Sequence, residues 1–437
     1  MLTAFARAFR TPDLRRKLLF TMAIMAVFRL GSFIPTPGVS YSAVQQCIDL
    51  THTASGGSAG LYQMVNLFSG GALLQLSVFA LGIMPYITAS IIIQLLTVVI
   101  PRFEMLKQEG QTGTAKLTQY TRYLTIGLAI LQSTTLVAIA RTPGNLFQSC
   151  QADLVPDDSM VTAAIMVITM TAGTGLIMWL GELVTERGVG NGMSLLIFTS
   201  IAAGFPSSIW AIRQSNGIDI MLIVIAVGLV ITALVVFVEQ CQRRIPVQYA
   251  KRMVGRRVLG GATTYIPIKV NMAGVIPVIF ASSLLYLPAL IAQFRRTSGD
   301  AWVDWIDRYL TRGDHPLYII SYFALIVFFT YFYVAITFNP DEVADNMRKY
   351  GGFIPGIRSG RPTAEYLDYV LTRITAPGSL YLGLISLIPL IALIVVNANQ
   401  KFPFGGTSIL IVVGVGLETV KQIESQLQQR HYEGFLR

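Results

Sequence analysis

Long apolar runs alternate with short polar segments along most of the 437-residue chain. Such runs predict membrane-spanning helices, because about 20 apolar residues are needed to cross a hydrocarbon core of about 30 Å. The last run is short and rich in glycine, and it gives the weakest signal. The pattern predicts about ten spans, near residues 18–35, 76–100, 120–140, 160–181, 192–212, 218–238, 272–293, 316–337, 376–397 and 403–419.

One apolar segment is too short to span. Leu61 to Phe68 would form a helix only ~12 Å long, and Ser69-Gly70-Gly71 separates it from the next run. An interfacial or re-entrant helix and a disordered segment both fit this pattern.

Composition supports a membrane protein. The chain is 53% hydrophobic and only 13% charged, with a mean hydropathy of +0.59. A soluble domain of this length would need far more charge to cover its surface. The net charge of +10 is compatible with binding to nucleic acid or to anionic lipid, and the positions of the charged residues decide between the two.

The positive charges fall mainly on one side of the predicted topology. With the N-terminus in the cytoplasm, the inner segments hold 25 lysines and arginines and the outer loops hold 7. This asymmetry is the positive-inside pattern, and it predicts that both ends of the chain are cytoplasmic.

Residues for catalysis are scarce. The three histidines lie in predicted loops or tails, and no metal-binding or nucleotide-binding motif is present. We therefore expect no enzymatic activity, no cofactor and no metal. A secondary solute transporter is the alternative, but the spans lack the midplane charges typical of ion coupling. Cys47 and Cys150 both face outward, so a disulfide is open to them, although the pattern favours two separate thiols.

Two predicted inner loops are unusually large, at residues 239–271 and 338–375. Topology anchors that attract anionic lipids are the simpler interpretation. An anchor needs charge beside the spans, however, whereas these loops place charge far from them. They are more typical of docking surfaces for a large cytosolic partner.

Seven motifs resemble the SecY family of bacterial protein-conducting channels, in family order and across nearly the whole chain. They are RLGSFIPTPG (29–38), NLFSGGAL (66–73), FALGIMPYITASIIIQLLTVV (79–99), ERGVGNG (186–192), KVNMAGVIPVIFASS (269–283), GFIPGIRSG (352–360) and FGGTSILIVV (404–413).

The resemblance implies an all-α integral membrane protein of about ten helices, built as two pseudo-symmetric halves around an hourglass pore. The halves would be residues 1–213 and 214–437. Residues 61–73 would fold into the outer funnel as a plug, with the glycines as a hinge. The plug positions are Leu61, Met64, Asn66, Phe68, Ser69, Gly70 and Gly71.

The resemblance also implies roles for single residues. A pore constriction of apolar side chains, which dewets when narrow, would be formed by Ile83, Ile87, Met193, Ile197, Ile279 and Ile411. Met193 departs from the isoleucine usual at its position. A lateral gate between the second and third spans and the seventh and eighth would hold three polar residues that can hydrogen-bond across the closed seam, namely Thr88, Gln132 and Asn271. For Thr88, a bond to its own helix backbone is the competing interpretation.

By the same resemblance, the protein would export unfolded polypeptides across the bacterial cytoplasmic membrane and release apolar segments sideways into lipid. The implied partners are SecE-like and SecG-like membrane subunits, the motor ATPase SecA, the translating ribosome, signal peptides with their unfolded preproteins, and anionic lipids. Motor or ribosome docking would involve Arg256, Arg257 and Arg358.

Overall fold

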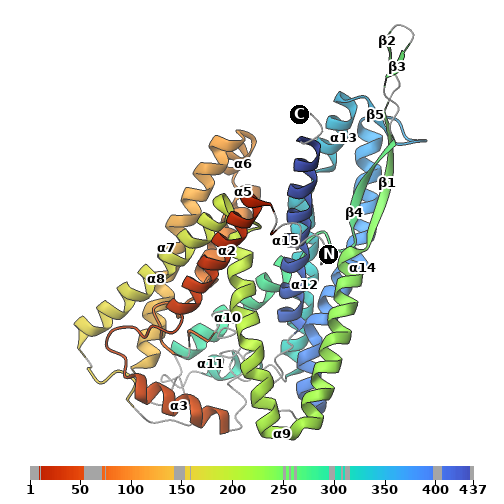
Figure 1. Cartoon of the computed structure of the whole chain (residues 1–437). Helices are drawn as coiled ribbons and strands as arrows, with labels where there is room; N and C mark the ends of the chain where they lie inside the picture. Colours follow the sequence, from red (N-terminus) through yellow and green to blue (C-terminus); the bar gives the residue numbers. More distant parts are fainter. Residues whose placement is uncertain are drawn as a thin grey trace.

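The computed structural model shows a mostly helical molecule (Figure 1). It describes residues 9, 11–53, 71–73, 75–141, 153–157, 159–249, 252–254, 257–259, 263–294, 301–306, 309–310, 315–396 and 406–433. Every predicted span overlaps a helix or one arm of a broken helix. In the described part of the chain, five helices are long and apolar enough to cross a membrane alone, or six if one bent pair counts as a span.

The N-terminal half of the chain forms the red, orange and yellow helices on the left of Figure 1. Their bounds are α2 Pro12–Gly31, α3 Tyr41–Thr53, α5 Met84–Val99, α6 Pro101–Gln108, α7 Gln111–Ala140 and α8 Met160–Arg187. The axes of α5 and α6 differ by 100°. The bend falls at Ile100, which is extended (φ −105°, ψ 112°) because a residue before proline avoids helical geometry.

The second predicted span begins later than the apolar pattern indicates. Residues 75–83 form turns, and the helix α5 begins only at Met84. Gly82 has a positive φ of 56°, and Pro85 lies in the first turn of the helix, where proline is well tolerated. Leu76, Phe79 and Leu81 are nevertheless buried, so the apolar run packs as turns instead of as helix. The start near residue 76 was therefore wrong.

Helix α9, Gly192–Gln240, contains the fifth and sixth predicted spans. Asn191 caps its start, with the side-chain oxygen accepting a hydrogen bond from the Met193 backbone N–H at 3.1 Å. The helix is broken at Gly217, whose φ of 85° and ψ of 176° are not helical. The break allows the second arm to return past the first (Figure 1).

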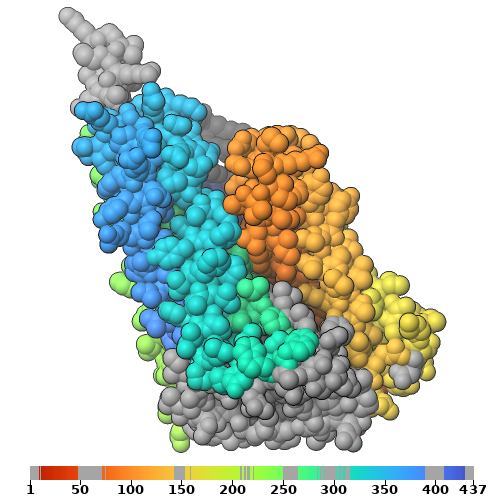
Figure 2. All heavy atoms as spheres, turned by 180° about the vertical axis from the view of Figure 1, so that it is seen from behind, coloured from red at the N-terminus to blue at the C-terminus, as the bar shows by residue number. Residues whose placement is uncertain are grey.

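The C-terminal half contains the remaining helices. Their bounds are α10 Ile276–Phe294, α11 Ala301–Ile306, α12 Pro316–Thr337, α13 Pro340–Lys349, α14 Arg361–Val396 and α15 Gly406–Glu433. Figure 2 shows α12 and α14, in cyan and blue, beside the orange and yellow N-terminal helices, with the green of α10 and α11 between them. Helix α14 begins at Arg361, so its first turns lie inside the predicted loop 338–375.

The first large inner loop is not a loop. It holds the strands β1 Gln242–Tyr249, β2 Arg252–Val254, β3 Arg257–Leu259 and β4 Thr263–Lys269, and β5 Gly352–Phe353 joins from the second loop. Strand β1 pairs antiparallel with β4, from Gln242 opposite Lys269 to Gln248 opposite Thr263. This hairpin projects beyond the helices (Figure 1). The sequence predicted a loop here, so the strands are an addition to the predicted architecture, and the mostly helical membrane fold is confirmed.

The hairpin is packed on one face. Ile245 and Val247 of β1 are buried and alternate with exposed residues. They join an apolar cluster that includes Ile268, Met347 of α13 and Leu367 of α14. Because this packing fixes the hairpin to two helices, it is a rigid projection of the C-terminal half.

Candidate functional site

All six expected constriction residues meet in one apolar cluster. They come from four elements: Ile83 caps the start of α5, Ile87 follows one turn later, Met193 and Ile197 lie on α9, Ile279 on α10 and Ile411 on α15. Ile83 and Ile411 are 2% and 1% exposed, and Ile87 is the partly buried member. These side chains form part of a buried apolar layer between the four elements.

The methionine in this layer has a specific neighbour. The sulfur of Met193 lies where a side chain at Gly181 of α8 would begin. The glycine therefore allows the thioether to lie directly on the α8 backbone, and an unbranched side chain fits this gap better than a β-branched one.

Only one end of the expected plug falls within the described residues. Leu61, Met64, Asn66, Phe68, Ser69 and Gly70 lie outside them. Gly71 has a φ of 91°, which suits the expected hinge, because side chains disfavour this geometry. The next residue, Ala72, is buried in the same cluster as the constriction residues, so this segment joins the layer directly.

The three expected gate residues do not hydrogen-bond to one another. The Thr88 hydroxyl donates to the carbonyl of Met84 in its own helix at 3.0 Å, as in the competing interpretation. Asn271 donates instead to Glu239, at 2.6 Å. Gln132 is partly buried and makes no hydrogen bond to the other two. Helix α10 contacts both α5 and α7, but the expected hydrogen bonds between these three side chains are absent.

Two carboxylates at the inner ends of spans were not assigned a structural role from the sequence. Glu182 of α8 pairs with Arg122 of α7, and Glu239 of α9 accepts from Asn271. Acidic residues in otherwise apolar helices are costly and are usually paired. Both carboxylates could have been singled out from the sequence, because charged residues are rare in these apolar runs.

The expected docking residues are placed unevenly. Arg256 lies outside the described residues, and Arg257 begins strand β3 on the projecting hairpin. Arg358 is exposed in a turn between β5 and α14. Its carbonyl accepts a hydrogen bond from the Thr363 hydroxyl at 2.8 Å. Gly356 and Gly360 provide the positive φ angles of 86° and 108° that this turn requires.

The cysteines differ from expectation. Cys47 on α3 is disulfide-bonded and buried, whereas Cys241 at the end of α9 is a free thiol. The preference for two separate outer thiols was therefore wrong. The remaining cysteine of the chain, Cys150, lies outside the described residues.

Comparison with known proteins agrees with this architecture. The family model described as SecY matches residues 77–420. The protein translocase subunits SecY of Streptomyces galbus and Mycobacterium tuberculosis (strain ATCC 25618 / H37Rv) are 69% and 60% identical to this chain, each over 100% of both sequences.

Solved structures share the fold at low sequence identity. The structure of a protein-conducting channel gives a TM-score of 0.61 at 18% identity, covering 94% of this chain and 91% of that one. Sec61 in the canine ribosome-channel complex from the endoplasmic reticulum gives 0.58 at 17% identity, with the same coverages.

The apolar spans and the matches to SecY proteins thus define a multi-pass membrane channel subunit. The chain belongs to the SecY family of protein translocase subunits. It is a bacterial, non-enzymatic channel that conducts polypeptides, and this assignment decides against the solute-transporter alternative.

Proposed function

We propose that Ile83, Ile87, Met193, Ile197, Ile279 and Ile411 form the constriction of this protein-conducting channel. The observation that carries the proposal is their convergence from four elements into one buried apolar cluster. Branched apolar side chains seal a narrow pore against ions and offer a passing polypeptide no polar contact to hold it. Residues 61–73 then act as the plug, and the seam where α10 meets α5 and α7 is the lateral gate.

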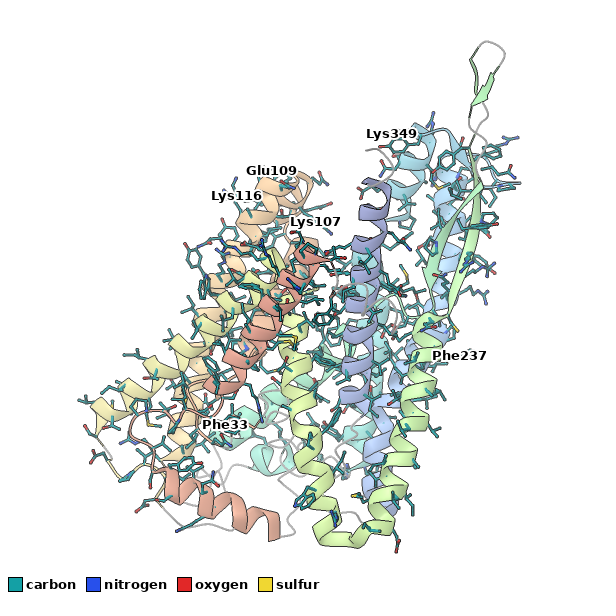
Figure 3. All side chains as sticks on the ribbon, viewed as in Figure 1. Phe33, Lys107, Glu109, Lys116, Phe237 and Lys349 are labelled. Carbon is teal, nitrogen blue, oxygen red and sulfur yellow. The ribbon has the colours of Figure 1, made fainter. Side chains whose placement is uncertain are left out.

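The distribution of positive charge supports the orientation proposed for the two halves of the channel. Residues 1–213 and 214–437 form the two halves, and both termini are cytoplasmic. In Figure 3, Lys107, Lys116 and Lys349 lie toward the same end of the molecule, as expected for a cytoplasmic face. The projecting hairpin is at this end as well.

The cytoplasmic projections are the proposed docking surface for a SecA-like motor or a translating ribosome. The hairpin carries Arg257, and the segment from Tyr350 to Arg358 carries an exposed arginine and the exposed aromatic residues Tyr350 and Phe353. Arginines and aromatic rings are enriched where proteins bind one another. The canine Sec61 and yeast Ssh1 structures that share this fold are complexes with ribosomes.

An exposed apolar face remains on the second arm of α9. Leu222, Val230 and Phe237 are 58%, 67% and 71% exposed, and Phe237 points away from the bundle in Figure 3. Lipid tails and small membrane subunits resembling SecE and SecG are the occupants that suit such a face. Signal peptides, preproteins and anionic lipids complete the proposed partners.

Replacement of Ile411 by Asn tests the constriction. An amide in this dry layer stabilises water in the pore, so we expect ion leakage through reconstituted vesicles and export of substrates with defective signal sequences. Ile411→Val, which keeps the layer apolar, is the matched control. Unchanged conductance together with unchanged signal selectivity in Ile411→Asn would remove this residue from the constriction.

A further inference from the structure

Two hydrogen bonds close the root of the β1–β4 hairpin, where the chain leaves α9 and enters α10. The Val270 backbone N–H donates to the carbonyl of Cys241 at 3.1 Å. The Asn271 side-chain Nδ2 donates to Glu239 Oε1 at 2.6 Å and to the Gly274 carbonyl at 3.2 Å. The first bond continues the hairpin ladder, whereas the second joins the side chains of two elements.

The orientation of the Asn271 amide is fixed by its partners. Both groups facing Nδ2 are acceptors, so the reversed amide would place oxygen against oxygen. Asn271 is 4% exposed, and its Oδ1 has no hydrogen-bond partner among the described residues. Glu239 therefore holds the Asn271 side chain in an orientation that leaves the Asn271 Oδ1 without a hydrogen bond in the described part of the chain.

A tyrosine of α14 lies in the neighbourhood of the Glu239 carboxylate. Tyr381 of α14 lies close enough to interact with it electrostatically, and the buried Tyr381 hydroxyl also has no partner within the described residues. Lys269 and Lys421 add positive charge nearby. The Asn271 Oδ1 and the Tyr381 hydroxyl are thus both buried without a hydrogen bond to any described residue, which makes this arrangement costly to keep.

The position of Asn271 connects it to the pore. It precedes α10, which carries the constriction residue Ile279 and contacts both α5 and α7 across the proposed gate. Behind it, a side chain at Gly378 of α14 would overlap the Val270 carbonyl oxygen. The start of α10 is thus closely packed against α14 and hydrogen-bonded to the end of α9.

We propose that Glu239 is a positioning residue that latches Asn271, and so the start of α10, to the root of the docking hairpin. The proposal rests on the lateral gate assigned above. A partner that binds the hairpin strains its root, and the hydrogen bond between Glu239 and Asn271 breaks. The start of α10 is then free to leave α5 and α7. The hairpin thereby couples docking to gating by shifting a two-state equilibrium.

Two single substitutions and their combination test the latch. Asn271→Asp places a second carboxylate against Glu239, so it should release α10. Glu239→Gln keeps an acceptor for Asn271 but removes the charge, so its effect should be smaller. In the double variant the introduced glutamine amide can donate to the introduced aspartate, so closure should return toward that of the unmodified protein.

The measurement is gate closure, read from cross-linking of an engineered cysteine pair placed across α5 and α10 in a Cys241→Ser background. We expect Asn271→Asp to lower closed-state cross-linking and to raise export of a substrate with a defective signal by about tenfold, within the usual range of coupling between sites. The control is Glu418→Gln, which neutralises an exposed carboxylate on α15 and should leave both readouts unchanged.

The outcomes separate the latch from the gate. If Ile411→Asn leaks but the latch variants gate like the unmodified protein, the latch is wrong and the constriction stands. If Asn271→Asp opens the gate and the double variant does not restore closure, the effect is general loss of packing and the latch is also wrong. If neither the Ile411 variant nor the latch variants change gating, the proposed gate itself fails.

Discussion

Arg122 of α7 binds Glu182 of α8 through two parallel hydrogen bonds, from Nε to Oε1 at 2.9 Å and from Nη2 to Oε2 at 2.8 Å. The third guanidinium nitrogen, Nη1, donates to Gln119 at 3.1 Å. Such a planar two-bond pair fixes both distance and orientation. The inner ends of the two helices are therefore held as one unit, so that α7 moves with α8 whenever the proposed gate opens.

Loss of this arginine should destabilise the protein. In Arg122→Gln, Glu182 keeps a carboxylate that is only 18% exposed and loses its charged partner. We expect a loss of about 1.5–3 kcal/mol in the free energy of unfolding, measured as a lower Tm in detergent. The control is Arg361→Gln, because Arg361 pairs with Glu365 at 89% and 68% exposure. This exposed pair should contribute at most about 1 kcal/mol. Equal losses in both variants would contradict the role given to the Arg122–Glu182 pair.

The crossing of α8 and α9 depends on glycine. A side chain at Gly192 would overlap the carbonyl oxygen of Gly181, so Gly192→Ala must separate the two helices and displace Met193 from the constriction. We expect about 1–3 kcal/mol of destabilisation and a measurable ion leak. Gly127→Ala on α7 is the matched control, because a side chain there meets open space. It should be neutral or slightly stabilising, since alanine favours helix by about 0.5–1 kcal/mol. If Gly192→Ala neither leaks ions nor loses stability, α8 and α9 tolerate a larger separation where they cross.

The helices could be predicted from the sequence because membrane spans are long and uniformly apolar, and that signal needs no tertiary information. The same signal placed the start of α5 too early, since it cannot distinguish helix from the buried turns around Phe79. The hairpin left a local signal that was missed. In QRRIPVQY, the buried Ile245 and Val247 alternate with exposed residues as in a strand packed on one face.

Side-chain pairing was harder to predict. The convergence of Ile83, Ile279 and Ile411 came from family resemblance, because an isoleucine in a span carries no local mark of its neighbours. The partner of Asn271 could not be inferred, since its choice between the gate seam and Glu239 depends on how α10 meets α9. The disulfide of Cys47 likewise depends on which segments the fold brings together.

The cysteines give a test of the fold and of its orientation without engineered labels. Cys47 is disulfide-bonded and Cys241 is free, and the one other cysteine in the chain is Cys150. After denaturation without reductant, mass spectrometry should therefore find alkylation at Cys241 alone, and at all three cysteines after reduction. Disulfides persist on the oxidising side of the membrane, so a disulfide at Cys47 in protein purified without reductant would place α3 on the outer side. Alkylation at Cys47 without reductant would contradict the pairing and with it this orientation.

Arg358 is the residue through which we expect a motor to act on the channel. The turn that carries it is shaped by Gly356 and Gly360, with φ angles of 86° and 108°, and by a hydrogen bond from the Thr363 hydroxyl to the Arg358 carbonyl. The Arg358 side chain is exposed, so its guanidinium is accessible to a partner. Replacing it should therefore cost the folded protein little stability. A guanidinium can bind a carboxylate through two bonds, which a lysine cannot reproduce.

We therefore expect Arg358→Glu to leave the Tm and the ion seal unchanged but to abolish export driven by a SecA-like motor in reconstituted vesicles, with Arg358→Lys intermediate. The repulsion introduced by glutamate acts only when the partner is bound, which is why folding should be unaffected. Lys349→Glu is the control, because it reverses another exposed charge at the same end of the molecule (Figure 3). Its export should remain close to that of the unmodified protein. Normal export by Arg358→Glu at limiting motor concentration would show that this arginine is only a solvated loop charge, while equal loss in both variants would indicate a general electrostatic attraction of the motor to this face.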